Sequence, residues 1–323
     1  MTRVLRTASA VLTNTFYSPD GETPEDSTTT VTVAVTDANG SAVTSGNATL
    51  DGGGTGTYRF SLPAQPQLQL LTVAWSATIN GAAVVEYSEV EIVGGFFFTI
   101  AKARASDSSL ADSTKYPTED LVAERIQVEQ ECEEICDRAF VPRYRRALLD
   151  GSGTDELLLP DCDIRTIRSV KVAPRAGLAF VAFTAGELAA LVARDNKVLR
   201  RADGNSWTSG EANVLIEYEY GLTAPPADLA RAAMIRLRSR LNLSKSKIPD
   251  RAISFTSAEG GTYRLSTPAA YRTGLPEVDA AYARYSRRPS DDSTDGGGGQ
   301  GAPASRPLNY DPQRDSLFHG GVS

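Results

Sequence analysis

Residues 116–143 read YPTEDLVAERIQVEQECEEICDRAFVPR, and this stretch separates a strand-rich part of the chain from a mixed part. Thr118 is placed to cap a helix, and acids follow it in the first turn, where they favour the positive end of the helix dipole. Pro142 is expected to end the helix. The acids of EQECEEICD (129–137) are expected to face solvent. Apolar positions recur at helical spacing: Val122, Ile126, Val128, Cys132, Ile135, Cys136 and Ala139.

Residues 1–100 are predicted to form an antiparallel β-sandwich of the Ig-like kind. Alternating runs such as TTTVTVAVTD (28–37) are separated by the turn signals DANG (37–40), DGGG (51–54) and NG (80–81). Trp75 is expected in the core between the sheets. This part holds 3 basic and 9 acidic residues. With the small residues of VGG (93–95) as a joint, it is expected to project as a separate module.

Residues 101–250 are predicted to form an α+β domain of helices and small sheets. Strand-like pieces follow the first helix, and Thr184 with Glu187 has the spacing of a capping box before a short helix. The strand-like runs KVLRR and NVLIEYEY flank Trp207. PPADLARAAMIRLRSRLNLSKSK (225–247) predicts another helix, with an apolar face and a basic face. The basic face is a candidate for subunit or DNA-channel contacts, or is simply a solvated face, and comprises Arg231, Arg236, Arg238, Arg240, Lys245 and Lys247.

FTSAEGGTYRLST (255–267) predicts a strand, a tight turn and a second strand, with no further strand after it in sequence. TGLPEVDAAYARYSRR (273–288) predicts a short helix that opens at Pro276. Residues 251–288 are therefore expected to act as one docking arm, or else to fold back on their own domain, because isolated hairpins and short helices are marginal in water. Residues 289–323 are expected to be a flexible tail. The expected partner-binding residues of the arm are Phe255, Tyr263, Arg264, Leu265, Val278, Tyr282 and Tyr285.

The residues that usually carry catalysis are sparse. The single histidine, His319, lies in the Gly- and Ser-rich tail, so neither a Ser-His-Asp nor a Cys-His arrangement is expected on the folded part. Cys132 and Cys136 are spaced for one helix face, where burial as small apolar side chains is favoured over metal binding; Cys162 stands apart. We expect no catalytic, cofactor or metal site, although a hydrolase that uses two carboxylates remains an alternative.

No run approaches the length of a membrane span, and the start of the sequence lacks the apolar core of a signal peptide. We therefore expect a protein made in the cytoplasm, without a membrane partner. The predicted sandwich leaves one alternative open, a secreted or surface protein that binds carbohydrate or mediates adhesion.

From Pro117 to Tyr285 the order of motifs resembles the head-to-tail adaptor (head-tail connector) proteins of long-tailed bacteriophages, above all phages of actinobacteria. The most specific phrases are YGLTAPPADL (220–229) and GGTYRLSTP with TGLPEVDA (260–268 and 273–280). The N-terminal region, including GTYRFSLPAQP (56–66), looks like an extension found on some actinophage adaptors. The minimal adaptor lacks such an extension.

The resemblance implies a structural protein of the virion neck. It implies a ring, twelve-fold in assembled virions, that binds the portal and hands the DNA channel to the next neck or tail protein. The expected partners are the portal, neighbouring adaptor subunits, the downstream neck protein and genomic DNA that passes without sequence recognition, with the capsid as a further contact of the N-terminal domain.

Overall fold

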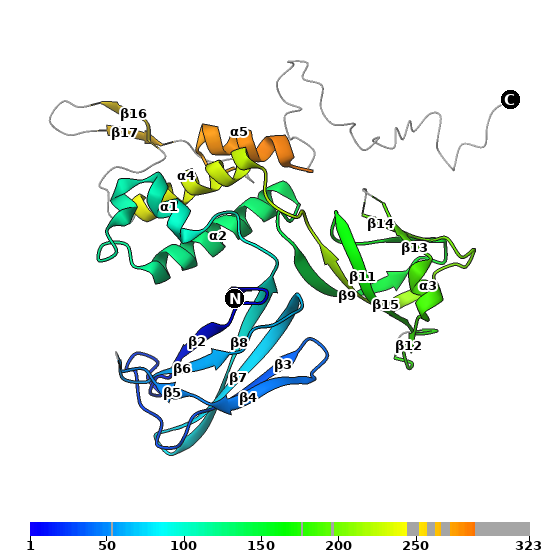
Figure 1. Cartoon of the computed structure of the whole chain (residues 1–323), viewed down its shortest axis with the longest axis horizontal. Helices are drawn as coiled ribbons and strands as arrows, with labels where there is room; N and C mark the ends of the chain where they lie inside the picture. Colours follow the sequence, from blue (N-terminus) through cyan, green and yellow to red (C-terminus); the bar gives the residue numbers. More distant parts are fainter. Residues whose placement is uncertain are drawn as a thin grey trace, which may run out of the picture.

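The computed structural model describes residues 1–52, 54–175, 177–194, 197–243, 252–256, 262–265 and 272–287. The fold is α+β: most of the helices gather at the upper left of Figure 1, with one region of sheet below them and a second region of sheet to their right. The part of the chain described contains no helix long and apolar enough to cross a membrane.

The N-terminal region consists of two packed sheets. One sheet has the strand order β1-β8-β7-β3-β4 and the other has the order β2-β6-β5. Trp75 is completely buried between them and packs edge-on against Phe60 of the smaller sheet, which confirms its predicted place in the core. The strands are β1 (Thr2–Leu5), β2 (Ala10–Thr15), β3 (Thr32–Asp37), β4 (Ala42–Asn47), β5 (Thr49–Leu50), β6 (Thr57–Leu62), β7 (Gln69–Ile79) and β8 (Ala82–Val93).

Local turn chemistry explains two of these connections. Asn80 and Gly81 join β7 to β8 with φ values of 51° and 76°, the conformation of a two-residue hairpin turn that Asn-Gly favours. Asp37 accepts hydrogen bonds from the backbone N–H groups of Asn39 and Ser41, which closes the DANG turn. The expectation of a wholly antiparallel region is wrong at one place, because β1 pairs with β8 in parallel.

The helical region has its own core. Leu121, Val128, Leu237 and Tyr282, which come from three different helices, belong to one buried cluster. Its helices are α1 (Ile100–Ser106), the 3-10 helix η1 (Ser108–Ala111), α2 (Thr118–Cys136), α4 (Ala227–Leu243) and α5 (Pro276–Tyr285).

The ends of α2 differ from the sequence prediction. Pro117 occupies the N-cap position without a side-chain hydrogen bond, and Thr118 is the first helical residue. The helix ends at Cys136, well before Pro142, because Asp137 adopts a left-handed conformation with φ 50° and ψ 43°. Aspartate tolerates this conformation better than most residues, so it can terminate a helix without proline or glycine.

A third core lies between two further small sheets, ordered β12-β11-β15-β9 and β10-β14-β13. Trp207 is buried in this core and stacks on Phe183. Thr184 and Glu187 form the predicted capping box at the start of α3. The elements are β9 (Arg143–Gly151), β10 (Glu156–Leu158), β11 (Ile164–Val172), β12 (Val181–Ala182), α3 (Ala185–Ala189), β13 (Leu191–Ala193), β14 (Val198–Arg201) and β15 (Gly210–Tyr220).

The predicted late hairpin is present as β16 (Ala252–Thr256) and β17 (Thr262–Leu265), paired in antiparallel fashion. Phe255 lies opposite Tyr263 in its register. Figure 1 shows the hairpin near the helices and apart from the two larger regions of sheet.

Candidate functional site

The N-terminal region is attached to the helices by a buried cluster of charges that we call the interdomain ion cluster: Arg3, Glu91, Glu129, Glu133 and Arg143. Arg3 of β1 lies 3.1 Å from Glu129 and 3.2 Å from Glu133, both on α2, and 3.2 Å from Glu91 of β8. Arg143 of β9 donates to both Glu91 and Glu133. The cluster thus joins β1, β8, α2 and β9.

Burial controls the electrostatics of this cluster. Burial raises the pKa of Glu129, while the backbone N–H of Phe97 and the guanidinium of Arg3 oppose the shift. For Arg143, burial lowers the pKa, but Glu133 and Glu91 outweigh it and raise the pKa above its ordinary value. Each buried charge has a partner of opposite sign, as the low polarity of an interior requires.

This cluster corrects one expectation. The sequence predicts that the acids of EQECEEICD face solvent, yet Glu129 is completely buried and the Glu133 side chain is only 15% exposed. The only feature of the sequence that indicates this shared environment is the spacing of four between Glu129 and Glu133, which places both carboxylates on one face of the helix.

The small residues of VGG also make a close contact. The backbone N–H of Gly94 donates to the carbonyl of Pro142 at 2.9 Å. A Cβ at position 94 would lie 2.6 Å from the Cβ of Pro142, so only glycine fits there without movement. The N-terminal region is therefore held against the start of β9.

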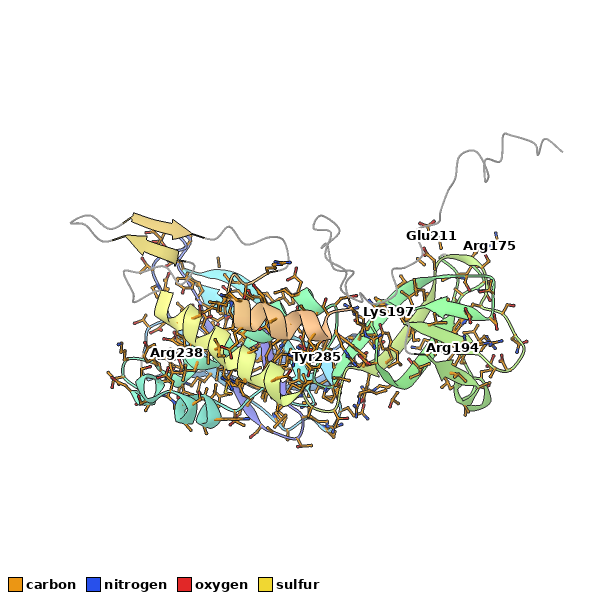
Figure 2. All side chains as sticks on the ribbon, turned by 90° about the horizontal axis from the view of Figure 1, so that it is seen from above. Arg175, Arg194, Lys197, Glu211, Arg238 and Tyr285 are labelled. Carbon is orange, nitrogen blue, oxygen red and sulfur yellow. The ribbon has the colours of Figure 1, made fainter. Side chains whose placement is uncertain are left out.

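The predicted apolar stripe of α5 faces this chain's own core. Val278 and Tyr282 are buried among residues of α2 and α4. Tyr285, half-buried, packs edge-on against Phe140 and donates its hydroxyl to Asp228 at 2.7 Å (its position is labelled in Figure 2). The side chains of Val278, Tyr282 and Tyr285 therefore make these contacts within their own chain.

The predicted basic face of α4 divides into two pairs. Arg236 donates two hydrogen bonds to Glu131 of α2, at 3.0 and 2.9 Å, and Arg240 donates to Glu124 at 2.7 Å. These two arginines hold α4 to α2.

The other pair points outward. Arg238 contacts Asp107 at 2.8 Å while 62% of its side chain stays exposed, and Arg231 contacts Glu277 at 3.4 Å with 73% exposed (Arg238 is labelled in Figure 2). Lys245 and Lys247 lie outside the described residues.

The hairpin carries the other predicted contact residues at backbone positions that the structure gives. Phe255 pairs with Tyr263, Ser254 with Arg264, and Ala252 with Leu265. Among the described strands, β16 and β17 pair only with each other.

The cysteines are free and buried, in agreement with their predicted apolar role. Within the described ranges, His, Cys, Asp and Glu side chains form no group of three suited to a metal ion. A hollow of about 750 Å³ at the β10-β14-β13 sheet contains arginines, and each is paired: Arg194 with Glu156, Arg200 with Asp155, and Arg201 with Asp203.

Neither a family model nor a curated protein matches the chain. Solved structures do match, and three of them come from gene transfer agent (GTA) particles. A chain of the neck of an empty particle computed with C6 symmetry is 16% identical, with a TM-score of 0.37, over 58% of this chain and 89% of that chain. A chain of the neck of a native particle computed with C12 symmetry is 15% identical, with a TM-score of 0.38, over 58% and 87%. A chain of the native virion is 15% identical, with a TM-score of 0.39, over 58% and 89%. Over somewhat more than half its length, the chain is thus distantly similar to proteins of GTA particles, two of them from the neck.

Proposed function

We propose that this chain is a structural neck protein of a phage-like virion, an adaptor that forms a ring between the portal of the DNA-filled capsid and the tail and continues the DNA channel. The observation that carries the proposal is the β16–β17 hairpin, which has no third strand among the described residues. A two-stranded sheet is marginally stable alone, and its outer edges are templates for strand addition. The hairpin therefore suits docking on another protein of an assembly.

The sequence phrases that carry the resemblance to phage adaptors surround this hairpin. YGLTAPPADL spans the end of β15 and the start of α4, the helix before the hairpin. TYRL forms β17, and LPEVDA covers the start of α5. Since Val278 and Tyr282 are buried in the helical core, α5 anchors the chain after the hairpin.

The docking residues that we propose are those of the hairpin: Phe255, Tyr263, Arg264 and Leu265. Their partner would be the portal, and a ring of twelve copies would present twelve hairpins, as the resemblance to adaptors implies. The outward Arg231 and Arg238, with Lys245 and Lys247, are the candidate contacts to a neighbouring subunit or to DNA in the channel.

The test is assembly with the portal protein encoded in the same genome, followed by electron microscopy of the purified complex. One variant replaces residues 252–265 by a Gly-Ser linker and keeps α5, because loss of Val278 and Tyr282 would open the helical core. We expect the unaltered chain to form a ring on the portal and the linker variant to remain unbound while melting at a similar temperature. A chain that ends at Arg288 is the matched control and should still assemble. Equal assembly by the linker variant would refute the docking role of the hairpin.

A further inference from the structure

Eight residues of β8, Ala82–Glu89, have a neighbouring strand on one side only. β7 pairs with β8 from Ala82 to Ile92, whereas β1 pairs only with Val90 to Val93. No other backbone hydrogen bond found in the described part of the chain reaches this segment. Because alternate residues of an edge strand direct their N–H and C=O groups away from the sheet, the open edge of about 26 Å can pair with a further strand.

Several other strand edges of the molecule carry features that discourage pairing, although the edge of β2 does not. β4 lies beside a register irregularity between Val35 and Thr36. β9 carries Arg143, Arg145 and Arg146. β10, β12 and β13 are only two or three residues long. Short length, irregular register, proline and charged side chains, especially lysine, are the usual protections of an edge. Ala82–Glu89 is regular and contains neither Lys, Arg nor Pro, and its only charges are two glutamates.

The charges near this edge specify what could pair with it. Glu86 and Glu89 are the charged residues of the segment, and the first hundred residues hold 9 acidic against 3 basic residues. Val85 is 50% exposed and Tyr87 is 72% exposed on the outer face of the sheet. Opposite charges on neighbouring strands stabilise pairing and like charges oppose it, so a second copy of the same acidic edge is disfavoured.

We propose that Ala82–Glu89 is a docking site for an extended segment of another protein, and that this segment carries Lys or Arg side chains. The incoming strand would lie end to end with β1, on the side of β8 where β1 already pairs. Main-chain hydrogen bonds would supply the general affinity, and contacts of its cations with the exposed Glu89 would supply selectivity, since Glu86 already accepts a hydrogen bond from Asn14 at 2.7 Å. This site is separate from the hairpin and does not depend on the proposed neck function.

The experiment measures amide hydrogen exchange by NMR on the full chain. The probe is a peptide of alternating threonine and valine with lysine at each end, and its control has glutamate at each end. In the free protein, alternate amides of Ala82–Glu89 should exchange rapidly, while those of Val90–Val93 that bond to neighbouring strands are protected. The lysine peptide should protect the rapid amides, and the glutamate peptide should bind at least about fivefold more weakly.

Charge-reversal variants test the site directly. Glu89→Lys should weaken binding of the lysine peptide, whereas Glu211→Lys, at an exposed glutamate of β15 in the other sheet region (labelled in Figure 2), should not. The proposal is overturned if the lysine peptide protects none of these amides, if both peptides bind equally, or if both variants behave alike. It is also overturned if protection without peptide rises with protein concentration, since a second copy would then occupy the edge.

Discussion

Nη1 of Arg3 donates to Oε2 of Glu129 across 126 positions of the chain, at 3.1 Å. The two side chains are 4% and 0% exposed. Removing one member of a buried pair leaves the other charge without compensation, which costs far more than the pair itself contributes. The first strand of the N-terminal region is therefore part of what stabilises α2, and the predicted separate module is closely coupled to the helices.

Replacement of Arg3 by Ala should lower the free energy of unfolding by about 3 to 5 kcal/mol, because Glu129 loses its partner in a buried site. Urea unfolding followed by circular dichroism measures the change. Arg6→Ala, at an exposed arginine near the same strand, is the control and should stay within about 0.5 kcal/mol of the unaltered chain. Equal stability of the two variants would show that the interdomain ion cluster has little energetic weight.

Replacement of Gly94 by Ala should cost about 1 to 3 kcal/mol, because the new methyl group would overlap Pro142 and force the two regions apart. Gly52→Ala is the matched control, since no atom lies within 4 Å of a Cβ built there. Thermal unfolding of both variants makes the comparison. If Gly94→Ala and Gly52→Ala melt at the same temperature, the structure around Pro142 accommodates the new methyl group without loss of stability.

Tyr282 should tolerate loss of its hydroxyl but not of its ring. The hydroxyl is buried and its polar neighbour is the thiol of Cys132, a weak hydrogen-bonding group, so Tyr282→Phe should leave stability unchanged within about 1 kcal/mol or raise it. Tyr282→Ala should cost about 3 to 5 kcal/mol, because it opens a cavity between α5, α2 and α4. Denaturant midpoints of the two variants test this, and a large loss in Tyr282→Phe would reveal a stronger partner for the hydroxyl.

Asp163 should contribute stability that depends on pH. Burial raises the pKa of Asp163, but hydrogen bonds from Arg138 and Cys162 outweigh it, so the pKa lies below its ordinary value. A lowered pKa in the folded state stabilises the protein above the unfolded-state value, about 3.9, and this contribution is lost as the pH falls through the folded-state pKa.

Asp163→Asn is the appropriate test because Asp163 has φ 55°, a conformation that Asn also tolerates. The variant should be less stable by about 1.5 to 3 kcal/mol near pH 7, since it loses charged hydrogen bonds from Arg138 at 2.6 and 3.0 Å. The difference in free energy of unfolding between Asp163→Asn and the unaltered chain should become smaller as the pH is lowered from 7 to 3. A difference independent of pH would mean that the charge of Asp163 is not what stabilises the site.

Features that depend on neighbouring residues were predictable from the sequence. The capping box of Thr184 and Glu187, the Asn80–Gly81 turn and the presence of the β16–β17 hairpin each follow from local spacing. The burial of Trp75 also followed, because its strand alternates apolar and polar side chains.

Features that depend on distant residues were not predictable. A carboxylate in a charged helix is usually solvated, and Glu129 is buried because Arg3 and the backbone N–H of Phe97, both distant in sequence, compensate its charge. The outward or inward direction of the α4 arginines likewise depends on α2, which supplies Glu124 and Glu131 to one pair. Nothing in the sequence of β1 or of β8 alone indicates that these two strands pair in parallel.

That parallel pairing gives the N-terminal region a mechanical property. β1 begins at Thr2, at one end of the parallel ladder, and β8 continues to Gly94 at the other end. A force that pulls Thr2 and Gly94 apart therefore acts along the strand axes, on β1 in one direction and on β8 in the opposite direction. The four residue pairs from Thr2–Val90 to Leu5–Val93 then bear the load together in shear. The β7–β8 hairpin, pulled open at its strand ends, would instead unzip one pair after another. The short ladder of β1 should thus resist a pull on the chain more strongly than its length suggests.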